Sequence, residues 1–165
     1  MSIVFPDWYA GGWSDRELLM LDLTQRWLDE LTPTGVSCTW IPDDIETLLA
    51  EGRVVARVHR GGLGADGIVD AAAIQVAVIT ASRADSWAAM EYLRQMILSY
   101  THGGPVRRED GSISLISFVE EINGPQQIEE MDLDDERIVP ATFRIESKLP
   151  DTVPDYARIR ESLPL

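Results

Sequence analysis

The sequence has one cysteine and two histidines among its 165 residues, and these shortages limit its chemistry. Cys38 can form neither an internal disulfide nor a cysteine-based zinc cluster. His59 and His102 each lack a second histidine or cysteine at metal-ligand spacing. Structural roles are therefore expected for both histidines, and for Cys38, which lies between the apolar residues Val36 and Trp40 in an alternating segment.

The sequence also has no long apolar run. Nothing approaches the roughly 18 consecutive apolar residues that a membrane-spanning helix needs. The first residues, MSIVFPDWYAGGWSD, place no basic residue before an apolar stretch, which is not typical of a secretory signal peptide. We therefore expect no membrane partner and assembly in the cytosol.

Negative charge is abundant, with 28 acidic against 14 basic residues and a formal net charge of -14. Such a surface repels nucleic acid phosphates. Between Glu120 and Glu136 the sequence has eight carboxylates and no base. A calcium loop is not predicted there, because the DLDDE run lacks the glycine that such loops need at their sixth position. The segment is interpreted as a solvated loop, or as an acidic surface that faces a basic partner or a DNA channel. The acidic residues proposed for that surface are Glu129, Glu130, Asp132, Asp134, Asp135 and Glu136.

Hydrophobic periodicity predicts the element order α-β-α-β-β-α-β-β. Helices are expected at residues 14–31, 43–52 and 83–100, and strands at 36–41, 53–60, 71–82, 113–122 and 138–148. This order predicts an α+β fold with a mostly antiparallel four- to five-stranded sheet and two main helices packed on one face, plus extended N- and C-terminal arms. The corresponding domain division is an N-terminal arm at 1–14, an α+β domain at 15–149 and a C-terminal arm at 150–165.

Local signals set the expected helix ends and buried faces. Ser14 and Glu17 are spaced as a capping box for the first helix, and Ser82 with Asp85 is expected to cap the third. The first helix should bury one stripe and the third helix another. These stripes are Leu18, Leu21, Trp27, Leu28 and Leu31 in the first helix, and Trp87, Met90, Leu93, Met96 and Ile97 in the third. In strand 53–60, alternation predicts that Val54, Ala56 and Val58 face inward and that Val55 faces outward.

Aromatic residues are concentrated near the two ends of the chain. Trp8, Tyr9 and Trp13 lie among glycines in the first arm, and Tyr156 lies in the last one. Large aromatic side chains bury extensive apolar area when they find a partner. These four residues are therefore predicted to anchor the arms on an apolar surface.

A glycine-rich loop lies between the strands predicted at 53–60 and 71–82. Gly62, Gly64 and Gly67 match G-x-G-x-x-G, the fingerprint of a dinucleotide-binding turn. That turn must open a helix whose N-terminus holds the pyrophosphate. Here the third glycine leads at once into a β-patterned run, which favours a hairpin tip. A nucleotide-binding enzyme remains the alternative hypothesis. Since no serine has a nucleophile-elbow context either, we expect no catalytic residue, no cofactor and no metal.

With these elements in order, the chain resembles the tail terminator proteins of long-tailed, siphovirus-type phages, especially phages of actinobacterial hosts. The resemblance covers roughly residues 18–148. The matching positions are a threonine- or serine-bearing corner before a helix, a Gly-Pro bend after a later strand, and a final alternating strand. These positions are Thr80, Ser82 and Arg83, then Gly124 and Pro125, then Ala141, Phe143, Ile145 and Ser147.

The resemblance implies a non-enzymatic virion protein, assembled in the host cytoplasm, that forms a ring at the end of the tail tube. Such a ring is expected to be a homo-hexamer that stops tube polymerisation and offers a surface to the head-tail connector or head-closure protein. DNA would pass through it without sequence-specific binding. The hairpin tip supplies the candidate contacts between subunits or rings, namely Gly61, Gly62, Leu63, Gly64, Ala65, Asp66 and Gly67. Another neck component, such as a head-closure or tail-completion protein, is the nearest alternative.

Overall fold

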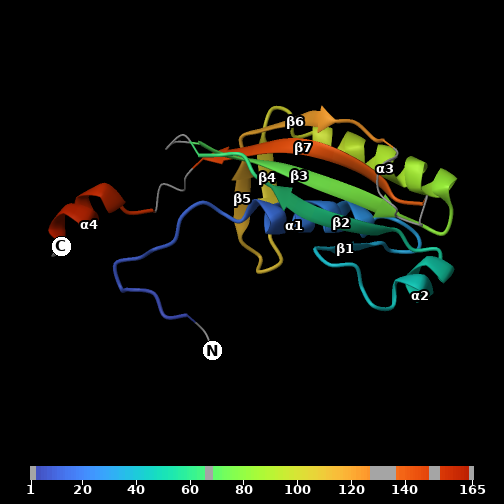
Figure 1. The fold of residues 1–165 in the computed structure, drawn as a ribbon, viewed down its shortest axis with the longest axis horizontal. Coiled ribbons are helices and arrows are strands. Elements are labelled where there is room, and N and C mark those ends of the chain that lie inside the picture. Colours follow the sequence, from blue (N-terminus) through green and yellow to red (C-terminus); the bar gives the residue numbers. More distant parts are fainter. Residues whose placement is uncertain (1–2, 66–68, 127–136, 149–152, 164–165) are drawn as a thin grey trace.

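The computed structural model describes residues 3–65, 69–126, 137–148 and 153–163, and within them the chain has an α+β architecture (Figure 1). The helices in this part are α1 (Arg16–Leu28), α2 (Ile45–Ala50), α3 (Arg83–Leu98) and α4 (Tyr156–Ser162). The strands are β1 (Val36–Cys38), β2 (Val55–Gly61), β3 (Val69–Ile79), β4 (Gly104–Arg107), β5 (Ile113–Ile116), β6 (Phe118–Asn123) and β7 (Val139–Lys148). The predicted fold class is confirmed.

The main sheet has five strands in the order β1-β2-β3-β7-β6. β3 is central and pairs antiparallel with β2 and with β7, and β6 pairs antiparallel with β7. Only β1 departs from this arrangement among the described strands, because it pairs in parallel with β2. The long apolar run of β3 suits this central position, where both faces of the strand are covered along much of its length.

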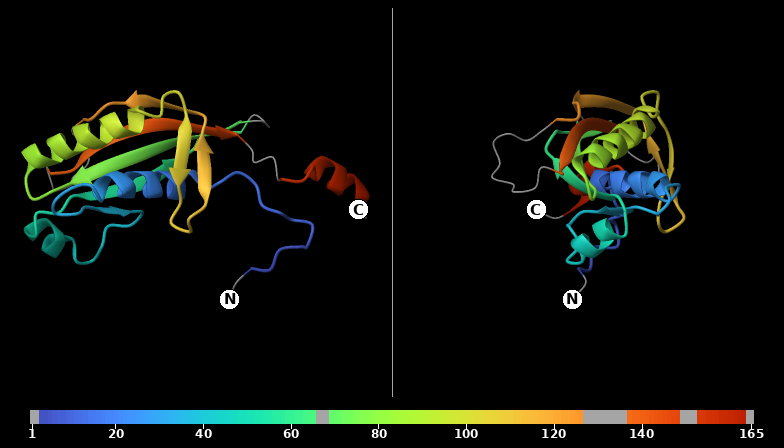
Figure 2. Two further views of the ribbon diagram at one scale, coloured as in Figure 1. Left: turned by 180° about the vertical axis from the view of Figure 1, so that it is seen from behind. Right: turned by 90° about the vertical axis from the view of Figure 1, so that its right-hand side faces the viewer.

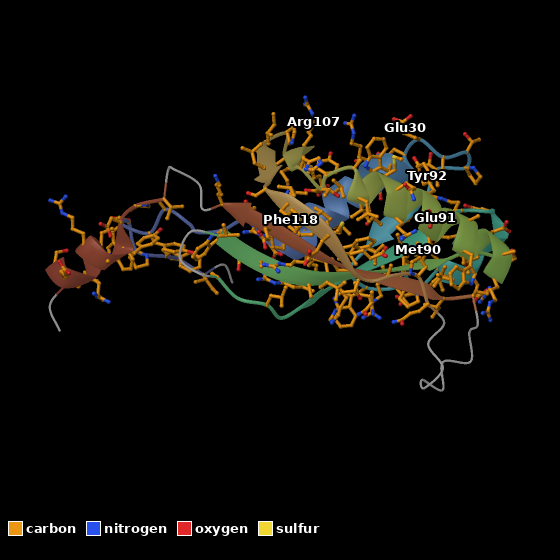
Figure 3. The ribbon with its side chains drawn as sticks, turned by 90° about the horizontal axis from the view of Figure 1, so that it is seen from above. Glu30, Met90, Glu91, Tyr92, Arg107 and Phe118 are labelled. Carbon is orange, nitrogen blue, oxygen red and sulfur yellow. The ribbon has the colours of Figure 1, made fainter. Side chains whose placement is uncertain are left out.

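The core lies between this sheet and two helices. α1 and α3 cover one face of the sheet, as the end-on view in Figure 2 shows. Met90 on α3 is buried on the sheet side of the helix (Figure 3). Tyr92 connects the two helices, because its hydroxyl donates a hydrogen bond to the carbonyl of Trp27 in α1. Every second side chain of each strand points toward these helices and completes the core. The helix-facing residues of β7 include Val139, Ala141, Phe143, Ile145 and Ser147.

A second, smaller apolar cluster lies on the other face of the sheet. There Leu48 and Leu49 of α2 pack with Val55 and Ile79. The prediction that Val55 faces solvent is therefore wrong, since this side chain is fully buried. Alternation along β2 is present, but α2 covers the end of the second face, so both sides of the strand are apolar there.

The start of α1 differs from the predicted capping box. Asp15, and not Ser14, is the N-cap, and its carboxylate accepts hydrogen bonds from the backbone N–H groups of Glu17 and Leu18. The Glu17 carboxylate instead accepts the backbone N–H of Arg60 in β2. The predicted stripe is also displaced, because Leu18 is 45% exposed and Leu21 is only partly buried. The fully buried apolar residues of α1 are Leu19, Met20, Leu23 and Leu28.

α3 follows its predicted signals more closely. The Ser82 hydroxyl accepts the backbone N–H of Asp85 at 3.1 Å and donates to the Asp85 carboxylate at 2.7 Å. Met90, Leu93 and Ile97 are fully buried. Trp87 is 37% exposed, so the predicted stripe is too wide on that side.

Several other features differ from the prediction. The predicted loop after α3 contains β4, which pairs with β5 as a separate hairpin. The single strand predicted at 113–122 is two strands divided at Ser117, whose backbone N–H donates to the carbonyl of Glu146. The strand predicted at 36–41 ends at Cys38, and Trp40, which that alternation placed on one face with Val36 and Cys38, is 81% exposed. The C-terminal arm contains α4.

Candidate assembly interface

The predicted glycine-rich tip joins β2 to β3 as an antiparallel hairpin. Pairing runs from Val55 opposite Ile79 to Gly61 opposite Ala73, and a bridge between Ala65 and Asp70 continues it. Antiparallel neighbours need no crossover helix. The β-hairpin interpretation of the glycine motif is thus confirmed, and the connection lacks the strand-to-helix geometry of a dinucleotide turn. Asp66 and Gly67 lie outside the described residues.

The described part of the tip is exposed, and its glycines are not forced by backbone geometry. A Cβ atom added to Gly62 or Gly64 would meet nothing within 4 Å, and neither residue has a positive φ. Leu63, between them, is 52% exposed. The tip therefore offers small residues and one apolar side chain to solvent without a structural demand for either glycine.

A buried ion pair lies at the base of this hairpin. Arg16 has 0% exposure, and its guanidinium lies 3.3 Å from the Asp70 carboxylate, which Arg60 approaches at 3.8 Å. Arg16 also donates to the carbonyl of Ser14. Burial lowers the pKa of the Arg16 guanidinium, and the Asp70 carboxylate acts in the opposite direction. Arginine side chains in proteins keep their charge, so the Arg16 guanidinium and the Asp70 carboxylate form a true ion pair.

This pair fixes three segments at one point: the end of the N-terminal arm, the first turn of α1, and the hairpin. Sequence reasoning missed it, although a signal exists. Asp70 is the one charged residue in β3, near its start, and a carboxylate in such a position requires a partner when it is buried.

The terminal arms meet each other through aromatic residues. The ring of Tyr156 stacks on that of Tyr9 with centroids 5.8 Å apart, and Trp8 meets it edge-on at 6.3 Å. Phe5 extends this cluster through Tyr9, at 5.0 Å. The Tyr156 hydroxyl accepts the backbone N–H of Ala10 at 3.0 Å and donates to the carbonyl of Gly11 at 2.5 Å. The first and last segments of the chain are thus joined by rings and by hydrogen bonds.

Of the four predicted anchors, Trp8, Tyr9 and Tyr156 make ring contacts with one another, whereas no described ring lies against Trp13. Trp13 is half-buried and lines an open cavity of about 580 Å³ together with Tyr9, Tyr156, Arg60 and Asp70. Three of the four anchors therefore lie beside the base of the hairpin, but the ring contacts hold the arms mainly to each other. α4 has no buried residue, and within the described chain it packs extensively on no other helix or strand.

The acidic candidates at residues 129–136 lie outside the described residues. The two earlier carboxylates of that acidic run are described, and both are paired. Glu121 lies 2.5 Å from Arg94 of α3, and Glu120 lies 3.6 Å from Arg144 of β7. Hydrogen bonds to Glu121 and Glu91 raise the pKa of the Arg94 guanidinium. The acidic run has no base of its own, yet bases from other elements neutralise its first part.

The positions that suggested a family resemblance have structural roles. The Thr80 hydroxyl donates to the carbonyl of Ser82 at 2.7 Å, and its backbone N–H donates to the hydroxyl of Ser86 at 3.0 Å. These bonds turn the chain from β3 into α3. The matched residues of β7 are buried, and Ala141, Phe143 and Ile145 belong to the main core. The pattern therefore reflects how the sheet and α3 are joined and packed.

Within the described residues, no group of three or more histidine, cysteine or acidic side chains is arranged to hold a metal ion. A search of the same residues finds no helix that is both long and apolar enough to span a membrane.

Comparison with known families adds a direct finding. The family model for phage tail termination proteins matches residues 12–154, which is wider than the predicted resemblance. No curated protein matches the chain significantly. The family match covers α1, every described strand and α3, and it ends before α4. The chain belongs to the phage tail termination protein family.

Proposed function

We propose that this member of the phage tail termination family is a ring-forming terminator. It caps the tail tube, stops tube polymerisation and provides the surface that joins the tail to the head connector. The observation that carries the proposal is the family match over residues 12–154. The host is proposed to be an actinobacterium and the phage a siphovirus-type virus, with assembly in the host cytoplasm.

The ring is proposed to be a homo-hexamer. A cyclic ring needs heterologous contacts, in which one patch of a subunit meets a different patch of its neighbour. Exposed features at separate places on the protein support this arrangement. The hairpin tip from Gly61 to Gly67 is the proposed contact with a neighbouring subunit or ring. The outer edges of β1 and β6 end the five-stranded sheet and can pair with a partner strand.

The proposed partners are the tail tube protein on one side of the ring and the connector or head-closure protein on the other. DNA passes through the ring without sequence-specific binding. The net charge of -14 supports this, because like charges on protein and phosphate prevent tight adsorption. Residues 129–136 are the proposed acidic surface toward the lumen.

Inactivation of the gene tests the proposal in the phage. A terminator mutant should produce tail tubes longer than the wild-type length, because nothing stops their growth. Filled heads that leak DNA beside tails of normal length would indicate a head-closure protein instead. Mass photometry of the purified chain tests the ring, with a six-copy species expected.

A further inference from the structure

We propose that the paired terminal arms of one copy dock on the Trp40 loop of the next copy. The arm pair comprises residues 3–12 and α4, and the Trp40 loop comprises residues 39–46, which lead from β1 into α2. The inference rests on the proposed ring and names one contact that builds it. It commits to a second copy of this chain as the occupant.

The arm pair exposes more apolar surface than its internal contacts can cover. Ile3 is 80% exposed, Val4 is 90% exposed and Phe5 is 59% exposed, although the ring of Phe5 touches Tyr9. Contiguous exposed apolar residues of this kind mark interaction surfaces. The internal aromatic contacts join the two arms into one unit and leave its outer side free.

The same arm pair carries two arginines that have no acidic partner among the described residues, alongside the exposed acidic residues Asp7 and Glu161. Arg158 and Arg160 of α4 are exposed and form no ion pair with another described residue. The nearest acidic residue before them, Asp155, is engaged as the N-cap of the helix. Arginines beside aromatic rings are frequent among residues that dominate binding energy at interfaces.

The composition of the Trp40 loop complements that of the arm pair. Trp40 is 81% exposed, the largest exposed fraction of any described aromatic residue, and Ile41 is 40% exposed. Asp43 and Asp44 follow them, are exposed, and have no ion-pair partner among the described residues. The loop thus offers apolar area beside unpaired carboxylates, where the arm pair offers apolar area beside unpaired guanidinium groups.

The two surfaces lie apart on the molecule. The arm pair extends beyond one end of the body, whereas α2 lies at the other end and the loop that leads to it runs beneath the sheet from the end of β1, in Figure 1 and in the view from behind in Figure 2. One chain therefore presents its arms to one neighbour and its loop to another. Such head-to-tail contacts close into a ring when the rotation between copies permits.

Mass photometry and sedimentation velocity of the full chain test the contact. Trp40→Ala should weaken self-association by about tenfold or more, as should Arg158→Glu combined with Arg160→Glu. Trp87→Ala is the matched control, since Trp87 is an exposed tryptophan on α3 that lies in neither surface. Thermal unfolding by circular dichroism verifies that each variant folds. Ion pairing also predicts weaker association at high salt.

Mixing variants gives the sharper result. The Trp40→Ala copy retains its arms, and the double arginine variant retains its loop. A mixture should form pairs through the one intact contact with the wild-type affinity, although each variant alone associates about tenfold more weakly or worse. Reversal of both loop aspartates, Asp43→Arg with Asp44→Arg, should restore association of the double arginine variant.

Rings that persist in the Trp40→Ala and double arginine variants would overturn the inference and leave the proposed terminator function intact. Arms that bind tail tube protein and not another copy would overturn it in the same way. A wild-type chain that stays monomeric and never joins tube ends would overturn the terminator proposal as well.

Discussion

Phe143 and Phe5 are the same residue type in two different regions of this protein. Phe143 lies in β7 beneath the helices and is 0% exposed, whereas Phe5 lies in the N-terminal arm and is 59% exposed. The body is held by sheet pairing and by side chains that alternate into one core. The arms are held mainly to each other, through Tyr156 and its neighbours. We therefore expect the body to fold independently, while the arms need a partner to bury their apolar surface.

The largest effect should come from truncating the buried phenylalanine. Phe143→Ala should lower the free energy of unfolding by about 3 to 5 kcal/mol, because it leaves a cavity in the main core. Phe5→Ala should change it by less than about 0.5 kcal/mol, since its site is mostly solvated. Urea titration followed by circular dichroism measures both. Equal losses in the two variants would mean that the arm is part of the folding unit.

The buried ion pair should give the next largest effect. Asp70→Ala leaves the Arg16 guanidinium buried without a counter-charge, so the expected loss is about 3 kcal/mol. Arg60→Ala is the control, because Arg60 is partly exposed and lies farther from the same carboxylate, and surface pairs contribute only about 0 to 1 kcal/mol. Urea titration distinguishes the variants. A stable Asp70→Ala protein would show that Arg16 finds another partner or reaches water.

Gly103 lies in a sterically constrained turn, whereas Gly64 lies in the exposed tip of the β2–β3 hairpin. Gly103 has a φ of +78°, and a Cβ atom there would lie 2.7 Å from the carbonyl oxygen of Ile116. Gly103→Ala should therefore cost about 2 kcal/mol. Gly64→Ala should cost less than about 0.5 kcal/mol, although it lies in the proposed contact. Melting temperatures compare the two, and a ring assay on Gly64→Ala then reports on assembly alone.

The smallest effect on stability should come from the hydroxyl that joins the arms. Tyr156→Phe removes both hydrogen bonds to the N-terminal arm, and each such bond is worth about 1 kcal/mol. The melting temperature of the body should not change, but limited proteolysis should cut the arms several times faster. Tyr9→Phe should leave the cleavage rate unchanged, because no described hydrogen bond uses that hydroxyl. If Tyr156→Phe lowers the melting temperature, the arms and body unfold together.

The same contrast explains what could be predicted from the sequence. The β2–β3 hairpin and the Ser82 cap follow from strong local patterns, and the structure confirms both. The cap of α1 could not be predicted, because the Glu17 carboxylate accepts a hydrogen bond from the backbone N–H of Arg60, which lies in a strand distant in the sequence. The prediction for Val55 is wrong for a similar reason, since α2 returns to cover it. In these last two cases a tertiary contact outweighed the local sequence signal.

The candidate interface was only partly predictable. Aromatic residues at both ends indicated anchors, and three of the four make ring contacts with one another. Their sequence positions could not show that Tyr156 binds the N-terminal arm, because that contact joins residues from opposite ends of the chain. The exposure of Trp40 was also missed, since an alternating pattern does not reveal where a short strand ends.

Tube length measures most directly whether this chain stops the growth of tail tubes, as proposed. Purified tail tube protein should be polymerised with and without the chain and imaged by negative-stain electron microscopy. Tubes should stop growing when the chain is added, and rings should be visible at their ends. Tubes of equal length in both samples, with no density at their ends, would contradict it.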